Sequence, residues 1–362
     1  MLTFLEMLQV AIDEGASDVF IVAGQPLSYK KGRNIYEIDD EKVMPATSRA
    51  LVEEAYQIGH RDISILEKTG DDDFAISVPT MARLRICAFK QRGSLGAVLR
   101  VVSFGIPDYK KMGIPEEIMN LADTQKGLIL VTGSAGSGKS TSLACMIDRI
   151  NHTRSGHIIT LEDPIEYLYR NDKSIVTQRE IGLDTADYVM GLRACLRQAP
   201  DVILVGEMRD YETIQIAMTG AETGHLVLST LHTVGAVNTI DRIIDIFPPN
   251  QQQQIRVQLS MLLQTVVSQQ LLPGVDGEVV PAFEIMHVNP AIRNLIRESK
   301  VHQIETIMSM SAEEGMITMD NSLLALVRDG KITPETALHY SVHPDLMEKR
   351  LRQLRGGVNH VR

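Results

Sequence analysis

The feature that most constrains this chain is a glycine-rich segment at residues 133–140, Gly-Ser-Ala-Gly-Ser-Gly-Lys-Ser, which fits the phosphate-binding pattern G-x-x-x-x-G-K-[ST]. The four apolar residues 128–131 before it are typical of a short buried strand. After it, apolar residues recur at helical spacing, at Leu143, Met146 and Ile150. A strand, a glycine loop and a helix N-terminus form an anion site, because backbone N–H groups turn inward and the helix dipole adds positive potential. Residues 133–140, the phosphate loop, therefore predict nucleotide binding in an α/β domain.

Two side chains of the phosphate loop have specific expected roles. Lys139 is expected to reach the β- and γ-phosphates, and the Ser140 hydroxyl to ligand Mg²⁺. The other residues expected to line the nucleotide site are Gly133, Ser134, Ala135, Gly136, Ser137, Gly138 and Thr141. ATP and Mg²⁺ are the expected cofactors. The alternative, a glycine-rich surface turn, is disfavoured by the flanking strand and helix.

Composition sets outer limits on the kind of protein. The chain has 362 residues, enough for two or three domains, with 44% hydrophobic and 23% charged residues, as in ordinary globular proteins. A formal net charge of −10 argues against non-specific binding to nucleic acid. The odd number of widely spaced cysteines, Cys87, Cys145 and Cys195, predicts neither a disulfide framework nor a paired metal site. With no secretory signal and no membrane-spanning run, we expect a cytoplasmic protein that reaches a membrane only through partners.

The pattern of elements predicts two domains joined by a linker. Residues 1–105 are expected to form a small α+β domain, residues 106–118 a linker with several prolines and glycines, and residues 119–362 the domain that carries the phosphate loop. In the first domain we expect helices over 2–12 and 47–56, strands over 19–23, 74–78, 84–89 and 97–102, and turns near Pro26 and Lys31. In the second we expect a parallel sheet of the apolar runs 128–131, 158–161, 202–205 and 226–228. After Pro248 we expect helices over 251–269, 291–298 and 320–328.

Two acidic clusters follow strands of this predicted sheet. Glu162 and Glu166 come just after the run 158–161, and Glu207 follows the run 202–205. Ligands of open α/β sheets bind at the carboxyl ends of the strands, so we expect these carboxylates beside the phosphate loop, as metal-ordering or basic groups. The alternative is that they are solvated acids at strand ends.

Two histidines flank the run 226–228 and are expected at the same sheet edge. His225 and His232 would there sense a nucleotide or a neighbouring subunit, whereas a lone histidine beside a strand is more commonly a packed or solvated side chain. Three arginines, Arg193, Arg197 and Arg209, are candidates either for phosphate sensing or for surface ion pairs.

Taken together, these motifs resemble those of the secretion ATPase superfamily. Residues 133–140, 162–166, 206–210 and 224–233 match its Walker A, Asp box, Walker B and His box. Within the superfamily the chain resembles the type IV pilus retraction ATPases, including a C-terminal segment at 291–298 that is associated with retraction. The resemblance covers nearly the whole chain, from Phe4 to Arg328.

The resemblance implies a fold, a reaction and partners. It implies a PAS-like N-terminal domain followed by a RecA-like P-loop ATPase domain, assembled as a homohexamer that hydrolyses ATP to drive pilus retraction and twitching motility. Glu166 would be the general base, and Glu207 would order Mg²⁺ through water. Phosphate-contacting arginines would come from the N-terminal domain, among Arg83, Arg85, Arg92 and Arg100. Implied partners are an inner-membrane pilus platform protein and the pilin machinery, which would hold the cytoplasmic motor at the inner membrane, and no nucleic acid is expected.

The sequence leaves three rival functions open. A pilus-assembly or type II/IV secretion export ATPase belongs to the same superfamily, although assembly enzymes usually carry a four-cysteine metal motif that this chain lacks. A nucleic-acid motor is disfavoured by the acidic balance and by 4% aromatic residues without tryptophan. A small-molecule kinase would need an acceptor-binding element, and none is visible.

Overall fold

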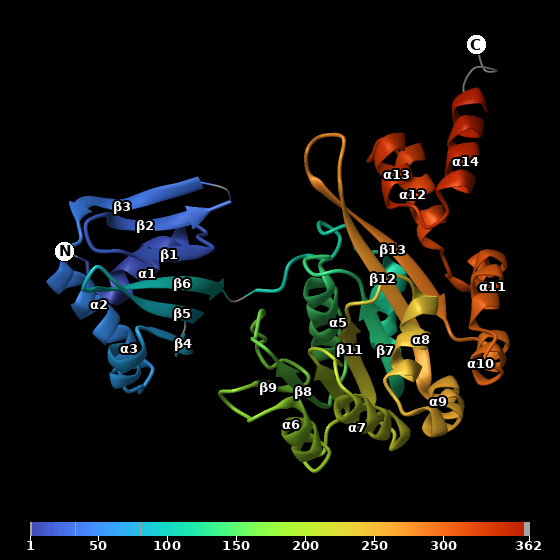
Figure 1. Cartoon of the computed structure of the whole chain (residues 1–362), viewed down its shortest axis with the longest axis horizontal. Helices are drawn as coiled ribbons and strands as arrows, with labels where there is room; N and C mark the ends of the chain where they lie inside the picture. Colours follow the sequence, from blue (N-terminus) through green and yellow to red (C-terminus); the bar gives the residue numbers. More distant parts are fainter. Residues whose placement is uncertain (1, 33, 80, 104, 358–362) are drawn as a thin grey trace. The chain divides into compact units, whose positions relative to one another are not determined.

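The computed structural model describes residues 2–32, 34–79, 81–103 and 105–357, which divide into two compact units (Figure 1). The first comprises Met1–Gly105 and the short segment Glu166–Tyr169, and the second comprises Ile106–Ile165 and Arg170–Arg362. The segment Glu166–Tyr169 differs from the expected division, which places it in the second domain. It belongs to the first unit because its neighbours lie there, a long-range relationship that local sequence does not encode.

The first unit is an antiparallel sheet with helices packed on it. Its six strands lie in the order β3-β2-β1-β6-β5-β4. The strands are β1 (Asp18–Ile21), β2 (Pro26–Lys31), β3 (Asn34–Lys42), β4 (Asp71–Val78), β5 (Ala82–Gln91) and β6 (Ser94–Ser103). The helices are α1 (Phe4–Asp13), α2 (Pro45–Ile58) and α3 (Ser64–Thr69).

Alternation along these strands buries one face of the sheet. In β5, Leu84, Ile86 and Ala88 are fully buried, whereas Arg85 and Cys87 between them are exposed. The buried side chains form one core with apolar residues of the three helices. Strands β2 and β3 were not predicted, because the turn residues near Pro26 and Lys31 obscure the alternation and β3 has no buried residue in its pattern.

The second unit is built on a seven-stranded sheet that holds the phosphate loop. The strand order is β13-β12-β7-β11-β10-β8-β9, with every neighbouring pair parallel except β12 and β13. The strands are β7 (Gly127–Thr132), β8 (His157–Glu162), β9 (Ile175–Glu180), β10 (Val202–Val205), β11 (Leu226–Leu231), β12 (Leu263–Pro273) and β13 (Val279–His287). Every residue of β7, β10 and β11 is buried, which confirms the expected parallel sheet of continuous apolar runs.

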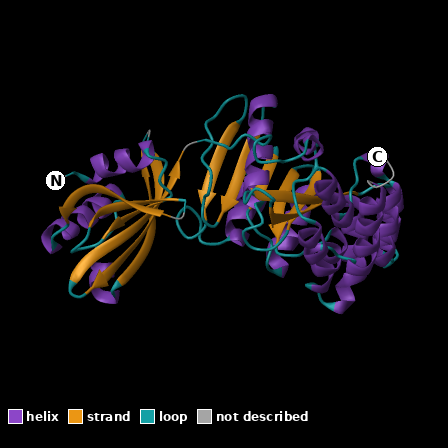
Figure 2. Ribbon diagram, turned by 90° about the horizontal axis from the view of Figure 1, so that it is seen from above, coloured by secondary structure: helices purple, strands orange, loops and turns teal. Residues whose placement is uncertain are grey.

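Helices cover this sheet, and further helices follow its last strand toward the C-terminus. Leu128 and Leu130 of β7 share a buried core with residues of α6, α7, α8 and α9, so these helices pack on one face. The early helices of the unit are α4 (Glu116–Met119), η1 (Asn120–Asp123), α5 (Lys139–Thr153), α6 (Tyr188–Cys195), α7 (Tyr211–Glu222), α8 (Ala236–Asp245) and α9 (Pro249–Leu262). The later helices gather near the C-terminus (Figure 2) and are α10 (Pro290–Arg297), η2 (Val301–Gln303), α11 (Ile304–Met310), η3 (Ala312–Glu314), α12 (Met319–Arg328), α13 (Pro334–Tyr340) and α14 (Pro344–Gly357).

The expected helix over 251–269 is wrong in its second half. Helix α9 ends at Leu262, and the chain continues as β12, which lies between β7 and β13. The pattern misled because glutamines follow at 264, 269 and 270, while β-branched Thr265, Val266 and Val267 are buried in the sheet. Tertiary pairing with β7 outweighs the local preference. The hairpin β12–β13 was missed for the same reason, and β9 was also not predicted.

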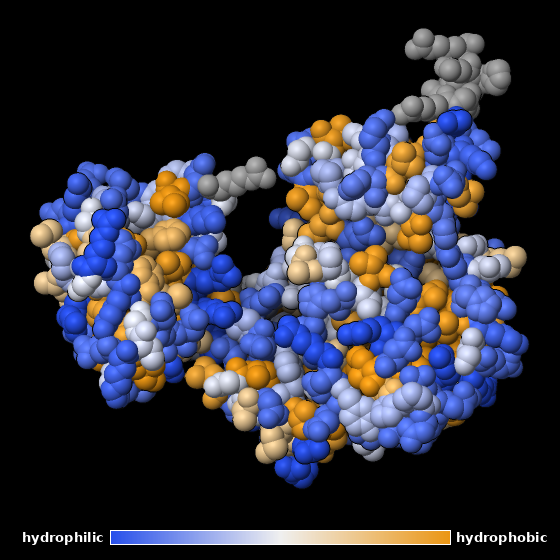
Figure 3. All heavy atoms as spheres, in the orientation of Figure 1, coloured by the Kyte–Doolittle hydropathy of each residue, from blue (hydrophilic) through white to orange (hydrophobic). Residues whose placement is uncertain are grey.

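The described surface is mixed in character. Figure 3 shows apolar side chains interspersed among polar ones on the face that it presents. Across residues 2–32, 34–79, 81–103 and 105–357, no helix has the length and hydropathy required to span a membrane.

Candidate active site

The phosphate loop lies at the carboxyl end of β7 and leads directly into α5. Lys139, the first residue of α5, is buried, and its Nζ donates hydrogen bonds to the carbonyl oxygens of Gly133 at 2.9 Å and Ser134 at 2.8 Å. The ammonium is thereby held over the turn of the loop. Gly136 and Gly138 have φ of 75° and 87°, a left-handed conformation that favours glycine.

Gly133 opens the loop where β12 approaches most closely. With φ of 143°, a Cβ built on Gly133 would lie 2.3 Å from the carbonyl oxygen of Gln269 and 2.6 Å from Oγ of Ser137. Any side chain at this position would therefore collide with β12. Gln269 was not singled out in the sequence, because its strand was expected to be a helix.

One hydroxyl just before the loop and one within it are buried and unpaired. In the part of the chain that the structure describes, Oγ1 of Thr132 and Oγ of Ser137 have no hydrogen-bond partner. Leaving buried hydroxyls unsatisfied costs free energy, so such groups are expected to find a partner in a bound ligand or water. An oxygen-rich anion in the loop would provide acceptors for them.

Glu207 and His232 meet at the ends of two neighbouring strands. Glu207 follows β10 after Gly206, and His232 follows β11 directly. Oε1 of Glu207 lies 3.3 Å from Nε2 of His232, and its Oε2 lies 2.7 Å from Nη2 of Arg209. Burial opposes ionisation of this carboxyl, but hydrogen bonds and charge from Arg209 and His232 outweigh it and lower the pKa of Glu207. The expected Walker B acid is therefore an ionised carboxylate.

A tyrosine that sequence reasoning missed packs against this turn. A Cβ at Gly206 would lie 2.8 Å from the hydroxyl of Tyr188 and 3.1 Å from the carbonyl oxygen of Leu161. Burial, followed by the negative charges of Asp163 and Glu207, raises the pKa of Tyr188. Tyr188 thus fills the space between the ends of β8 and β10 as a neutral side chain.

The Asp-box residues divide between the two units. Glu162 ends β8, where its Oε1 accepts hydrogen bonds from Oγ1 of Thr160 at 2.6 Å and Nε2 of Gln178 at 3.2 Å. The backbone N–H of Ile165 donates to Oε2 of Glu180 at 3.1 Å, which holds the following turn. Glu166 belongs to the first unit, with residues 166–169.

The expectation that His225 converges on this edge is wrong. Strand β11 pairs in parallel with β7, so Leu226 lies opposite Gly127 and Leu231 opposite Thr132, which precedes the loop. His225 therefore sits at the amino edge, where its carbonyl oxygen accepts a hydrogen bond from the N–H of Gly127. The seven residue steps from His225 to His232, at about 3.3 Å each, place the two histidines ~23 Å apart along the strand. Two histidines that flank one strand necessarily lie at its opposite ends.

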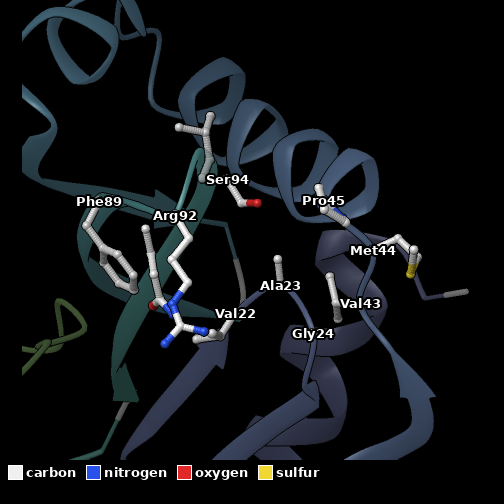
Figure 4. A pocket seen from close by; sticks show the side chains of 12 residues that line it. Val22, Ala23, Gly24, Val43, Met44, Pro45, Phe89, Arg92 and Ser94 are labelled. Carbon is white, nitrogen blue, oxygen red and sulfur yellow. The ribbon is translucent and has the colours of Figure 1, made fainter.

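The four N-terminal arginines lie in the first unit, and three of them share one face of its sheet. Arg85 and Arg100 are directly opposite in the pairing of β5 with β6, and Arg83 is two residues before Arg85. Nη1 of Arg83 donates to Oγ of Ser77 at 3.0 Å. Arg92 lies apart, in the turn between β5 and β6, at a pocket lined by Val22, Met44 and Phe89 among others (Figure 4).

The residues expected to hold a metal are an exposed hydroxyl and an ionised carboxylate. Within the described residues, no group of three or more His, Cys, Asp or Glu side chains is arranged to hold an ion. Ser140, in the first turn of α5, and Glu207 are hard oxygen donors, and Mg²⁺ is usually held by one or two such groups together with water and substrate phosphates. The donor set therefore fits Mg²⁺ bound along with a nucleotide and does not fit a metal site made by protein alone.

Known proteins resemble this chain over nearly its whole length. The family model described as "Type II/IV secretion system protein" matches residues 2–280. The type IV pilus retraction ATPase PilT of Pseudomonas aeruginosa is 42% identical over 94% of this chain and 98% of its own, and the type IV pilus ATPase PilU of the same organism is 40% identical over 93% and 88%. A crystal structure of the pilus retraction motor PilT with bound ADP superposes with a TM-score of 0.87 at 46% identity, covering 96% of this chain and 100% of that one. The expected fold class, an α+β N-terminal domain followed by a RecA-like ATPase domain, is confirmed.

Proposed function

The chain belongs to the type II/IV secretion system protein family, and on that basis we propose that it is a motor ATPase that couples ATP hydrolysis to retraction of a type IV pilus. The observation that carries the proposal is the arrangement at one sheet edge: the phosphate loop after β7, Glu207 after β10 and His232 after β11. Relatives named as pilus retraction ATPases are similar over nearly the whole chain, which supports retraction over other uses of the same fold.

Nucleotide binding would begin with an exchange of partners at Lys139. Its ammonium now donates to the carbonyl oxygens of Gly133 and Ser134. The β- and γ-phosphates of ATP would replace those neutral acceptors with charged ones, which form hydrogen bonds about twice as strong. The backbone N–H groups of the loop and the N-terminus of α5 add positive potential at the same place.

The carboxylates would have different roles in ATP hydrolysis. Glu166 would accept a proton from the attacking water, and Glu162 would support the same acidic turn. Ser140 and Glu207 would hold Mg²⁺, which when bound supplies positive charge to offset that of the phosphates. The lowered pKa of Glu207 keeps its carboxylate charged for this role, and His232 orients it from 3.3 Å.

Mechanical work requires a part that moves with the nucleotide state. Arginines of the first unit, among Arg83, Arg85, Arg92 and Arg100, would contact the phosphates and form a lid that excludes water. Six copies would form a ring, docked on an inner-membrane platform protein beside the pilin machinery. We place the motor in the cytoplasm, peripheral to the inner membrane through those partners.

A deletion strain tests the proposal most simply. Loss of a retraction motor leaves cells over-piliated but unable to twitch. A bald strain would identify an assembly ATPase instead. An unchanged count of surface pili together with normal twitching would remove the chain from pilus function altogether.

A further inference from the structure

Gln269 of β12 lies against the phosphate loop. The last residue pair between β12 and β7 joins Ser268 to Thr132, so Gln269 lies beside Gly133, where β7 ends and the loop begins. Gln269 is only 3% exposed. The loop is therefore braced on one side by a strand from a distant part of the sequence.

Both ends of the Gln269 carboxamide are engaged with the region of the loop. Its Oε1 accepts a hydrogen bond of 2.8 Å from Oγ of Ser142, a fully buried residue in the first turn of α5. Its Nε2 faces Gly138, where a built Cβ would lie 2.8 Å away. The main chain contributes as well, since the carbonyl oxygen of Gln269 is 2.3 Å from the Cβ position of Gly133. One residue thus confines the first and the last glycine of the loop.

The pleat of β12 makes this property specific to Gln269. Leu271, two residues on, also points toward Gly138, with Cδ1 3.8 Å from its Cβ position. The residues on either side of Gln269 point the other way. Ser268 accepts a hydrogen bond from the N–H of Gly235 at 2.9 Å, and Gln270 lines a cavity with Val234–Asn238 at the start of α8. The adjacent glutamines Gln269 and Gln270 therefore face opposite sides of the sheet.

We propose that Gln269 is a positioning residue that fixes the shape of the phosphate loop and so sets its affinity for the phosphates of a nucleotide. The inference rests on the proposed ATP site. A loop must present its N–H groups in one geometry to bind phosphate strongly, and a brace that holds this geometry before binding reduces the ordering cost of binding. Without the carboxamide, α5 loses the hydrogen bond that Ser142 donates to β12.

The test compares Gln269→Ala with the matched control Gln270→Ala, which removes the same group from the same strand on the other face. We expect Gln269→Ala to raise the Kd for ADP about tenfold, the effect of one lost hydrogen bond with some loss of order, and Gln270→Ala to change it less than twofold. Gln269→Met, which keeps the side-chain volume without the amide, should behave like Gln269→Ala. The rise in Tm caused by saturating ADP should shrink in both Gln269 variants.

These measurements separate positioning from support of the fold. A purely structural role would lower the Tm of the unliganded protein in Gln269→Ala, would be rescued by Gln269→Met, and would leave the Kd for ADP unchanged. That result, or equal Kd values for the Gln269 and Gln270 variants, overturns the inference while wild-type ATPase activity continues to support the proposed function. If wild-type protein neither bound ADP nor hydrolysed ATP, the proposed function and the inference would both fall.

Discussion

Nε2 of His232 lies 3.3 Å from Oε1 of Glu207, so two residues that follow neighbouring strands are paired beside the phosphate loop. His225, at the other end of the same strand as His232, is bound instead through its Nδ1 to the carbonyl oxygen of Gly220 at 2.9 Å. The two histidines flank one strand yet belong to different environments. The difference yields a paired prediction.

His232→Ala should weaken ATP binding, and His225→Ala should not. Loss of His232 leaves the Glu207 carboxylate with one fewer partner near the phosphates, and we expect the affinity for ATP to fall about tenfold. His225→Ala serves as the control, because its position at the amino edge is remote from the loop. Titration with a fluorescent ATP analogue measures both. Equal losses in the two variants would show that the sheet-edge assignment is mistaken.

Glu166→Gln should bind nucleotide with near wild-type affinity but lose turnover. The amide keeps the size of the side chain and cannot accept the proton of the attacking water, so we expect at least a hundredfold loss of kcat. Steady-state ATPase assays with a parallel binding measurement check this. Wild-type turnover in the variant would remove Glu166 from the role of base.

Gly206→Ala should damage the site through Tyr188. The added Cβ would lie 2.8 Å from the tyrosine hydroxyl, and overpacking of this kind costs about 1–3 kcal/mol. The double variant Gly206→Ala with Tyr188→Phe should recover part of that loss. Gly220→Ala in α7 is the matched control, since its built Cβ meets nothing nearer than 3.4 Å. Unfolding in urea measures the free energies, and a Gly220 variant as unstable as the Gly206 variant would contradict the steric account.

Asp72→Asn should destabilise the first unit and weaken the dependence of its unfolding free energy on pH in the acid range. Asp72 accepts hydrogen bonds from Arg61 at 2.6 and 2.8 Å and from Tyr56 at 2.9 Å, and the bond with Arg61 is the main cause that lowers its pKa below 3.8. A lowered folded-state pKa gives stability that is present above pH 3.8 and is lost as the pH falls through the folded value. We expect the free energy of unfolding at neutral pH to fall by about 2 kcal/mol.

The control for that prediction is Asp71→Asn, the exposed neighbour in β4. Circular dichroism during denaturation at several pH values gives the free energy of unfolding. If Asp72→Asn unfolded with the same acid dependence as wild type, the Arg61–Asp72 pair would not be the source of that dependence.

Sequence predicted the parallel strands of the second unit because they are buried on both faces. The apolar runs 128–131 of β7 and 202–205 of β10 are continuous, so no knowledge of neighbours is needed to recognise a strand. The phosphate loop, Glu207 and His232 followed, since their places depend only on following such strands.

The parts that sequence did not predict depend on partners distant in the chain. Gln269 looks like a helix residue until β12 is paired with β7 and its side chain meets Ser142. The packing of Tyr188 becomes apparent only when its hydroxyl is placed against the turn at Gly206, which has no Cβ. His225 was misplaced because the direction of β11 was not applied to the residue before it.

ATP hydrolysis by the purified full chain without nucleic acid, compared between wild-type and Lys139→Ala proteins, tests the proposed motor activity at its source. Lys139 holds the centre of the loop through Gly133 and Ser134, and its loss removes the positive charge expected on the phosphates. We expect steady release of phosphate by wild type and neither ATP binding nor turnover by the variant. Equal activity in the two proteins, or wild-type activity that appears only when DNA or RNA is added, would contradict the proposal.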